Sequence, residues 1–364
     1  MKNSLASLGD VEMGLDLKFN LALIGFGKVG QGLAHLLLSK RDDLRSHHAF
    51  EYEVVAVSDL KLGAVFDREG LDLAKLLSLA KNEGSLSGYP GGIKGLSALD
   101  SIMKTNCDVV VEATWTNLED GEPGLIHVRT ALENGRHIVT SNKGPIALRY
   151  RELARLAERM EVMLRFEATV LSGTPALNLG SEALAGATFT SIRGILNGTT
   201  NYILTGMGEG VSYEEALRKA QEEGYAEADP TADVEAWDPA AKITILANVL
   251  MGGTLELGDV ERQGITQISP IDVQAAGRAG MKIKLIAEAR RVDGEVSASV
   301  KPERIPASDP LANVGGVLNA ITFSSDVQED VTVVGPGAGG GSAGFALLSD
   351  LLAINRLDSA SRRP

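Results

Sequence analysis

The sequence is poor in cysteine and has no long apolar run. Cys107 is the one cysteine in 364 residues, so an internal disulfide is impossible and a reducing compartment is expected. No stretch of 18 apolar residues occurs, and the first residues lack the apolar centre of a cleavable signal peptide. These absences predict a cytoplasmic protein that does not enter a membrane.

Basic residues are also in short supply. The chain has 35 Lys and Arg residues against 48 Asp and Glu residues, which gives a net charge of −13. Nucleic acids and anionic membranes bind basic surfaces, so neither is an expected partner. Hydrophobic residues make up 44% and charged residues 23%, a balance typical of globular proteins, and the length allows two domains.

Glycine, in contrast, is abundant, and one glycine cluster carries a motif. An apolar run at 19–24 leads directly into Gly25, Phe26, Gly27, Lys28, Val29 and Gly30, and a helical pattern follows. This order of strand, G-x-G-x-x-G and helix is typical of a dinucleotide-binding turn. The first glycine allows the tight turn, the second lets the backbone approach a pyrophosphate, and the third lets helix and strand pack closely. Residues 25–30 are therefore expected to bind NAD or NADP.

The choice between these two cofactors depends on residues after the second predicted strand, 53–58. Asp59 ends this strand, where an acid usually accepts a hydrogen bond from the ribose 2′-hydroxyl and so favours NAD. Lys61 follows two residues later and could bind the 2′-phosphate of NADP instead. The sequence leaves the preference open and predicts that both cofactors are used.

Two further residues are expected at the ligand-binding edge of the same sheet. Thr114 directly follows a buried strand predicted at 108–113, and Lys143 follows a strand predicted at 137–140. Open parallel sheets bind their ligands at the carboxyl ends of the strands. From position alone, a structural role for Lys143 is as good an interpretation as a functional one.

The pattern changes after residue 162. Strands and helices alternate up to residue 150, whereas the later part mixes helices with a hairpin predicted around Asp293-Gly294. We predict an α/β fold: a Rossmann-type dinucleotide-binding domain at 18–166, completed by 338–364, and an inserted α+β domain at 167–337 that binds substrate and forms a dimer. Residues 1–17 are expected to be flexible.

Residues 225–242 place several carboxylates before one lysine. Asp238-Pro239 predicts the start of a helix with Asp238 as N-cap, and Lys242 falls on the apolar stripe of that helix, one turn later. The helix N-terminus and burial favour a neutral amine, whereas Asp238 favours the ammonium ion, so Lys242 is a candidate proton donor and acceptor. A capped helix behind a solvated acidic loop is the purely structural alternative.

These segments together resemble the homoserine dehydrogenase family over residues 18–355. The matching segments include GFGKVG, GILNGTTNYILT, GYAEADPTADVE, DPAAKITILANV and GPGAGGGSAG. The resemblance implies reversible, NAD- or NADP-dependent hydride transfer between L-homoserine and L-aspartate 4-semialdehyde, on the branch toward threonine and methionine. It also implies a homodimer.

The resemblance further implies roles for individual residues. Lys242 would donate a proton to the aldehyde, with Lys143 as the competing candidate. The other roles would fall to substrate-binding Glu227, Asp233 and Asp238, to Thr114 and Lys143 at the nicotinamide, to Gly339 in a loop that closes over the cofactor, and to Glu167, Val170, Ser172 and Thr174 in a site for Na⁺ or K⁺.

The sequence departs from the family pattern in a few places. Ala236 follows Glu235 where the family more usually has glycine, and Asp309 stands where histidine is common. The chain ends at Pro364 soon after the last predicted helix, so neither the regulatory domain of longer relatives nor threonine inhibition through it is expected.

Two alternatives compete with this interpretation. An acylating semialdehyde dehydrogenase needs a nucleophilic cysteine, but Cys107 precedes a core strand. A non-catalytic dinucleotide sensor would be expected to lack Lys143 or Lys242, and both are present.

Overall fold

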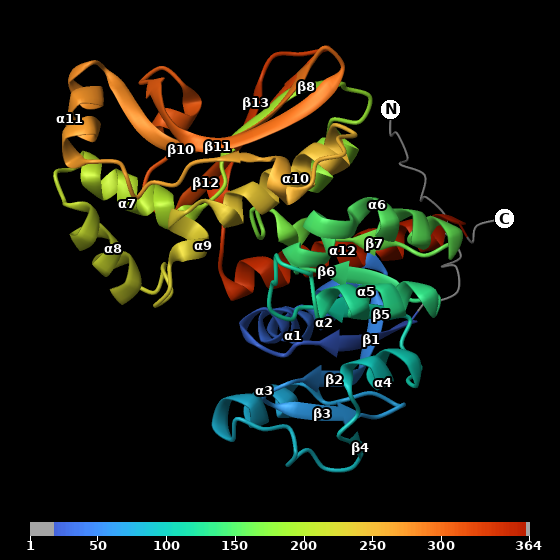
Figure 1. Ribbon diagram of the computed structural model, residues 1–364. Helices are drawn as coiled ribbons and strands as arrows, with labels where there is room; N and C mark the ends of the chain where they lie inside the picture. The colour runs from blue at the N-terminus through green and yellow to red at the C-terminus, as the bar shows by residue number, and fades with distance from the viewer. Residues whose placement is uncertain (1–17, 362–364) are drawn as a thin grey trace, which may run out of the picture.

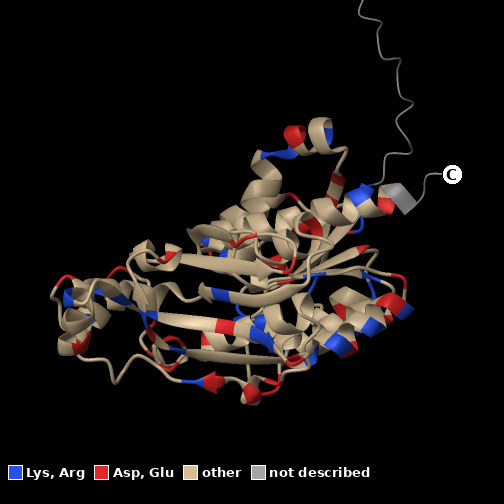
Figure 2. Cartoon of the chain, turned by 90° about the horizontal axis from the view of Figure 1, so that it is seen from above, with Lys and Arg blue, Asp and Glu red and all other residues tan. Residues whose placement is uncertain are grey.

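The computed structural model describes residues 18–361 and arranges them around two β-sheets (Figure 1). The segment 1–17, predicted to be flexible, lies outside the described residues. Among residues 18–361, no helix combines the length and the apolar character that crossing a membrane requires. Acidic and basic residues are interspersed along the cartoon of Figure 2 rather than separated by sign.

The first sheet has seven strands and the strand order of a dinucleotide-binding fold. Across the sheet the strands are β4 (Ile93–Lys94), β3 (Gly63–Phe66), β2 (Glu51–Asp59), β1 (Lys18–Ile24), β5 (Val109–Glu112), β6 (His137–Thr140) and β7 (Leu164–Arg165). The five strands from β2 to β7 are parallel, and β3 and β4 add an antiparallel edge. Strand β1 pairs with β2 on one side and with β5 on the other, so the order in which strands are added to the sheet reverses between β1 and β5. Sheets of this kind bind their ligands at this switch point.

Seven helices accompany this sheet. They are α1 (Lys28–Ser39), α2 (Arg41–His48), α3 (Leu73–Asn82), α4 (Ala98–Met103), α5 (Gly124–Glu133), α6 (Lys143–Arg159) and α12 (Gly340–Ser361). Side-chain caps fix the starts of three of them, because Asp72, Ser97 and Asn142 accept backbone N–H bonds at the beginning of α3, α4 and α6. The three starts therefore follow from local sequence.

The last helix, α12, returns to the first sheet and packs against α1 (Figure 1). A Cβ atom added at Gly32 would lie 2.4 Å from the carbonyl oxygen of Gly340, and one added at Gly344 would lie 2.6 Å from the amide nitrogen of Leu33. The two helix backbones are thus in direct contact, and only glycine fits at these positions. We call this contact the glycine seam.

The second sheet has six strands from the later part of the chain. Their order is β13 (Val331–Pro336), β12 (Leu318–Ser325), β8 (Phe189–Ile195), β10 (Met281–Val292), β11 (Glu295–Pro306) and β9 (Glu261–Arg262). The predicted hairpin joins β10 and β11, with Val292 paired to Glu295. Its two loop residues, Asp293 and Gly294, both have positive φ, as a two-residue type I′ turn requires.

Helices cover one face of this sheet. The main ones are α7 (Gly198–Gly208), α10 (Trp237–Leu250) and α11 (Pro270–Arg278), while α8 (Tyr213–Glu222) and α9 (Thr231–Val234) pack on α7. Apolar strand residues such as Leu285, Val300 and Phe323 join Ile243 and Ala247 of α10 in one buried core. The predicted fold class, a Rossmann-type part with an inserted α+β part, is confirmed, whereas the exact boundaries at 166 and 337 stay predictions.

One predicted helix start is wrong. Helix α10 begins at Trp237 with Ala236 as N-cap, so Asp238 lies inside the first turn and does not cap the helix. The reason is the short helix α9 just before it: the amide of Ala236 bonds to the carbonyl of Asp233, and Ala236 turns the chain with φ +63°. The Asp238 carboxylate is thereby free for contacts with other side chains.

Candidate active site

The glycine motif lies at the switch point, and its three glycines have different surroundings. Gly25 has φ +92°, and a Cβ there would lie 2.5 Å from the carbonyl oxygen of Ala113, the residue directly after β5. A Cβ on Gly30 would lie 2.3 Å from the carbonyl oxygen of Gly25. Gly27, the N-cap of α1, would place its Cβ with no protein atom within 4 Å. The turn therefore leaves open space at the helix N-terminus, as the approach of a pyrophosphate requires.

Asp59 holds this turn in place. Its carboxylate accepts hydrogen bonds from the amide of Phe26 at 2.8 Å and from the amides of Lys61 and Leu62, each at 2.9 Å. A carboxylate has about four acceptor positions, so three are already used and about one remains for a ribose hydroxyl. The side chain of Lys61 is exposed beside it.

Thr114 and Lys143 both lie at the carboxyl edge of the first sheet, as expected from sequence. Thr114 follows β5, and Lys143 is the first residue of α6 after its N-cap Asn142. The Asn142 amide group donates to the carbonyl of Trp115 at 3.0 Å and so ties the two strand exits together. The Nζ atom of Lys143 lies 3.5 Å from Oδ1 of Asp238, which comes from α10 beside the other sheet.

Lys242 lies on the buried face of α10, with 8% of its side chain exposed. Its Nζ atom donates to Oδ2 of Asp238, one turn earlier, and to the carbonyl oxygen of Leu196 at the end of β8, both at 2.7 Å. Asp238 thus contacts Lys242 with one oxygen and Lys143 with the other. The contact between Asp238 of α10 and Lys143 of α6 therefore links the regions of the two sheets.

Asn197 completes the cluster. Its side-chain amide donates to Oδ1 of Asp233 at 2.6 Å and to Oδ2 of Asp238 at 2.9 Å, and its oxygen caps α7 at the amide of Thr200. Neither Asn197 nor the Leu196 carbonyl is predicted from sequence. The one available signal was an Asn at the end of a strand, directly before the Gly-Thr-Thr start of a helix.

The pKa values of the half-buried carboxylates of Asp233 and Asp238 are shifted in opposite directions. Burial raises the pKa of Asp233, and the charge of Asp238 raises it further, against the hydrogen bond from Asn197. Burial also acts to raise the pKa of Asp238, but Lys242 and Lys143 together outweigh it and hold that pKa below its usual range. Asp238 is therefore a fixed negative charge between two lysines.

Two other predicted residues lie apart from this cluster. Glu227 is exposed in the segment between α8 and α9, where Gln221 bonds to its backbone carbonyl. Gly339 precedes α12 with φ +118°, a conformation that favours glycine.

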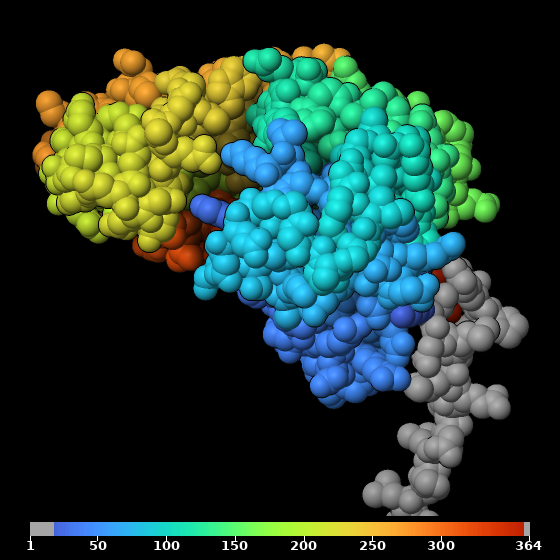
Figure 3. Space-filling view, turned by 90° about the horizontal axis from the view of Figure 1, so that it is seen from below, coloured from blue at the N-terminus to red at the C-terminus, as the bar shows by residue number. Residues whose placement is uncertain are grey.

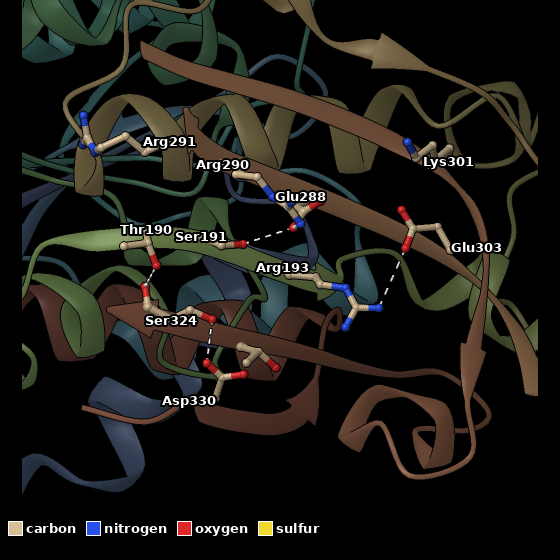
Figure 4. Close-up of a pocket in the computed structure, with 11 residues that line it drawn as sticks. Thr190, Ser191, Arg193, Glu288, Arg290, Arg291, Lys301, Glu303, Ser324 and Asp330 are labelled. Atoms are coloured by element: carbon tan, nitrogen blue, oxygen red, sulfur yellow. Dashed lines mark hydrogen bonds and ion pairs between the residues drawn. The ribbon is translucent and has the colours of Figure 1, made fainter. Parts of the chain in front are cut away.

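The surface is hollowed between the two sheet regions. Figure 3 shows a recess between the yellow segment around residues 210–240 and the blue and cyan N-terminal part, with red C-terminal residues at its floor. An open groove of about 770 Å³ lies elsewhere, on the outer face of the second sheet (Figure 4). That groove is lined by charged side chains including Arg193, Glu288 and Glu303, but not by Lys143, Lys242 or Asp238.

Comparison with known proteins places the chain in one family. The family described as Homoserine dehydrogenase matches residues 175–352, and that of Glutamate/Leucine/Phenylalanine/Valine dehydrogenase matches residues 12–122. An NAD(+)-dependent homoserine dehydrogenase from Pseudomonas canavaninivorans is 44% identical over 349 residues, covering 95% of this chain and 98% of the relative. A homoserine dehydrogenase from Methanocaldococcus jannaschii is also 44% identical, over 92% of this chain and 98% of its own length.

This chain belongs to the homoserine dehydrogenase family. A solved structure of a hyperthermophilic archaeal homoserine dehydrogenase mutant in complex with NADPH superposes with a TM-score of 0.81, at 28% identity, covering 96% of this chain and 99% of the other. The predicted family, function and enzyme class, an NAD(P)-dependent oxidoreductase, are confirmed.

Within this homoserine dehydrogenase fold, the residues matched to a cation site surround a buried acid. The Glu167 carboxylate accepts amide N–H bonds from Ala176 at 2.6 Å, Leu177 at 3.1 Å and Asn178 at 2.5 Å. Burial raises the pKa of Glu167, although these amides oppose the shift. No cluster of three or more His, Cys, Asp or Glu side chains that could hold a metal occurs in residues 18–361.

The other three matched residues form the turn beside Glu167. Val170 is buried, and Ser172 has φ +53° and a buried hydroxyl without a hydrogen-bond partner. Thr174 donates its hydroxyl to the carbonyl of Pro336 at 2.9 Å. The chain thus offers one carboxylate and an unpartnered hydroxyl at this place.

Proposed function

We propose that this chain interconverts L-homoserine and L-aspartate 4-semialdehyde, with Lys242 as the proton donor to the aldehyde oxygen. The observation that carries the proposal is the state of the Lys242 ammonium group. It has three N–H donors, of which Asp238 and the Leu196 carbonyl take two. The third is left for a substrate oxygen that gains negative charge.

The surrounding charges suit an amino-acid substrate. Asp238 contacts Lys242, and Asn197 links Asp238 to Asp233. Carboxylates bind an α-ammonium group through charge-assisted hydrogen bonds. Helix α7 begins at Gly198 directly after Asn197, so its positive end lies beside the same cluster and suits an α-carboxylate. Glu227 would join the ammonium side if its exposed segment moves toward the cluster.

We propose that both NAD and NADP serve as cofactor, bound at residues 25–30 and covered by the loop that contains Gly339. When bound, the nicotinamide takes hydride from the alcohol or gives it to the aldehyde. Asp59 retains about one acceptor position for a ribose hydroxyl, and Lys61 is free to meet a 2′-phosphate. The relatives offer precedents for both, one named NAD(+)-dependent and one solved with NADPH.

Lys143 is the competing proton donor. It also contacts Asp238, but at 3.5 Å, and 24% of its side chain is exposed against 8% for Lys242. We assign Lys143 to orient Asp238 and to contact the nicotinamide together with Thr114. Substitution of the two lysines separates these roles.

A purified sample tests the proposed function directly. NAD(P)H absorbance should rise when L-homoserine and oxidised cofactor are added, and should fall with L-aspartate 4-semialdehyde and reduced cofactor. L-Serine, which is one carbon shorter, serves as the control substrate and should react far more slowly. Absence of turnover with homoserine in both directions would refute the proposal.

A monovalent cation at Glu167, Val170, Ser172 and Thr174 is proposed for the joint between the two sheet regions. The unpartnered Ser172 hydroxyl and the turn at Leu171 and Ser172, both with positive φ, support it. The three amides on Glu167 already compensate much of its charge, so the expected effect is modest. Equal activity in Na⁺, K⁺ and tetramethylammonium salts would contradict the site.

We also propose a cytoplasmic homodimer that uses the outer face of the second sheet (Figure 4). Opposite charges alternate there, as in Arg193 beside Glu303 and Glu288 beside Arg290, so the face can pair with a second copy across a two-fold axis. Sedimentation should give a dimer, and Arg193→Glu should weaken it.

A further inference from the structure

Glu112, at the carboxyl end of β5, has no exposed surface and no part in the proposed reaction. Its Oε1 atom accepts hydrogen bonds from the amide of Thr114, at 3.1 Å, and from the Thr114 hydroxyl. Its Oε2 atom lies 3.0 Å from the hydroxyl of Thr140. His127, itself buried, places Nδ1 3.6 Å from Oε1. Glu112 thus lies directly beneath the edge where Thr114 and Lys143 emerge.

This contact fixes the group to which the Thr114 hydroxyl donates its single proton. A threonine hydroxyl has one proton to donate and two lone pairs to accept with. Because the proton goes to Glu112, the Thr114 oxygen acts as an acceptor toward every other group. One lone pair takes the Asn142 amide at 3.3 Å, and the second is left for a ligand.

This assignment does not depend on whether Glu112 is ionised. If Glu112 carries a proton on Oε2, it can donate to the Thr140 oxygen, while Thr140 donates to the backbone carbonyl of Glu112 at 3.0 Å. In both states Oε1 remains an acceptor for Thr114. The polarity of the Thr114 hydroxyl is therefore built into the fold.

We propose that Glu112 is a positioning residue that makes Thr114 an acceptor and so selects a cofactor group that donates N–H, the carboxamide of the nicotinamide ring. The assignment rests on the proposed function in placing the nicotinamide beside Thr114. If the group on the ring has an acceptor and no N–H, it faces the lone pair of the Thr114 oxygen, and the hydrogen bond between the ring and Thr114 is lost.

The test compares two reduced dinucleotides by titration calorimetry, without substrate. NADH carries the carboxamide, whereas reduced 3-acetylpyridine adenine dinucleotide carries a methyl ketone, which keeps the carbonyl and lacks N–H. The wild-type protein should bind NADH about five- to tenfold more tightly, the effect of one hydrogen bond. Thr114→Val should bring the ratio of the two dissociation constants close to one.

Two substitutions of Glu112 then separate polarity from mere packing. Glu112→Gln should keep the wild-type ratio, because the amide oxygen still accepts from Thr114 while the NH₂ group donates to Thr140. Glu112→Leu should bring the ratio close to one, because the freed hydroxyl can donate to the ketone. If Glu112→Leu does not fold, Thr114→Val and Glu112→Gln decide the question between them.

A wild-type ratio in Thr114→Val, or a ratio lost in a folded Glu112→Gln, would overturn the inference. These outcomes are distinct from failure of the proposed function. A protein that discriminates the two dinucleotides but does not oxidise homoserine refutes the function alone. One that oxidises homoserine with a wild-type ratio near one refutes the role of Glu112 alone.

Discussion

The dinucleotide turn and the Lys242 cluster are built in opposite ways. In the turn, backbone geometry sets the requirement for glycine. A Cβ on Gly30 would collide with the carbonyl oxygen of Gly25, and a Cβ on Gly25 would collide with that of Ala113, directly after β5. In the cluster, side chains from distant segments meet, as when Lys242 bonds to Leu196, 46 residues earlier. A substitution in the turn is therefore expected to disturb binding and folding, whereas one in the cluster is expected to disturb chemistry.

Lys242→Ala removes the central side chain of the cluster and is expected to have the largest effect. Loss of a positioned general acid and base typically lowers the rate by about 10²–10⁴-fold, and kcat should fall by that order in both directions. The dissociation constant for NADH, measured by calorimetry, should change little because residues 25–30 are untouched. Lys242→Arg should rescue little, since guanidinium keeps its proton.

Lys143→Ala is the matched comparison, because both lysines contact the same carboxylate. We expect a smaller loss of kcat together with weaker cofactor binding. If Lys143→Ala abolishes turnover while Lys242→Ala retains most of it, Lys143 is the donor and Lys242 supports Asp238.

Gly25→Ala and Gly27→Ala test the glycine requirement of the dinucleotide turn. Gly25→Ala should destabilise the fold by about 2 kcal/mol or more, because alanine is strained at φ +92° and its methyl meets Ala113. Gly27→Ala should leave the free energy of unfolding nearly unchanged, because its Cβ meets no protein atom. It should nevertheless weaken cofactor binding by at least about tenfold, from the lost close approach of the pyrophosphate.

Urea unfolding and calorimetry distinguish these outcomes. Unchanged cofactor affinity in a folded Gly27→Ala protein would show that the pyrophosphate does not approach this glycine. A fully stable Gly25→Ala protein would show that the turn can relax.

The joint between the two regions should respond to pH. Asp350 of α12 is buried and accepts from the amide of Glu167 and the side chain of Asn178. Burial, with a further contribution from the charge of Glu167, raises its pKa from 3.8 to about 7. The folded state thus holds a proton that the unfolded state has lost between these values, so stability should fall as pH rises from about 4 to about 7 and then level off.

Asp350→Asn isolates this contribution. The substitution removes the titration, so the decline in the free energy of unfolding between pH 5 and pH 8 should be smaller than in the wild-type protein, by a few kcal/mol at most. Its control is Asp272→Asn on the exposed surface, whose pKa is lowered by Ser269 and which should not reduce that decline. An identical decline in wild type and Asp350→Asn would contradict the expectation.

Ala236→Gly has the smallest expected effect. It tests whether backbone conformation matters in the Lys242 cluster as well, because Ala236 is the N-cap of the helix that carries Asp238 and Lys242. Ala236 has φ +63°, in the left-handed region, which costs an alanine about 1–2 kcal/mol and favours glycine. Glycine relieves this strain but adds freedom to the unfolded chain, so the net change should lie within about 1 kcal/mol. A larger loss of stability, with kcat unchanged, would show that the buried methyl group matters more than the strain.

The difference between local backbone geometry and contacts between distant segments also explains which features could be predicted from the sequence. The turn at 25–30, the Asp293-Gly294 hairpin and the burial of Lys242 follow from spacing within a few residues, and all were predictable. Strand β12 and helix α2 were not, because their short patterns of apolar and polar residues have no decisive period. The contact of Lys143 with Asp238 joins residues almost a hundred positions apart, and no local pattern carries it.

Individual side chains were harder still. The spacing of Asp238 and Pro239 predicted that Asp238 caps the helix. Instead, α9 and the left-handed Ala236 place the N-cap two residues earlier, at Ala236, and leave the Asp238 carboxylate to contact the two lysines. Asp59 was predicted from its place at a strand end, but its hydrogen bonds were not. Two of the amides that it accepts from, those of Lys61 and Leu62, lie in the next loop, and the third is that of Phe26 in the glycine turn. Residue type indicated the chemistry, and only tertiary contacts indicated the partners.

The glycine seam sets an order of events during synthesis. Helix α1 leaves the ribosome early, but its backbone partner α12 is made after the whole of the second sheet, some three hundred residues later. At typical elongation rates of about 5–20 residues per second, the first sheet waits tens of seconds for the helix that covers α1. The second sheet can assemble within that interval, so the part that begins the chain is the last to be completed.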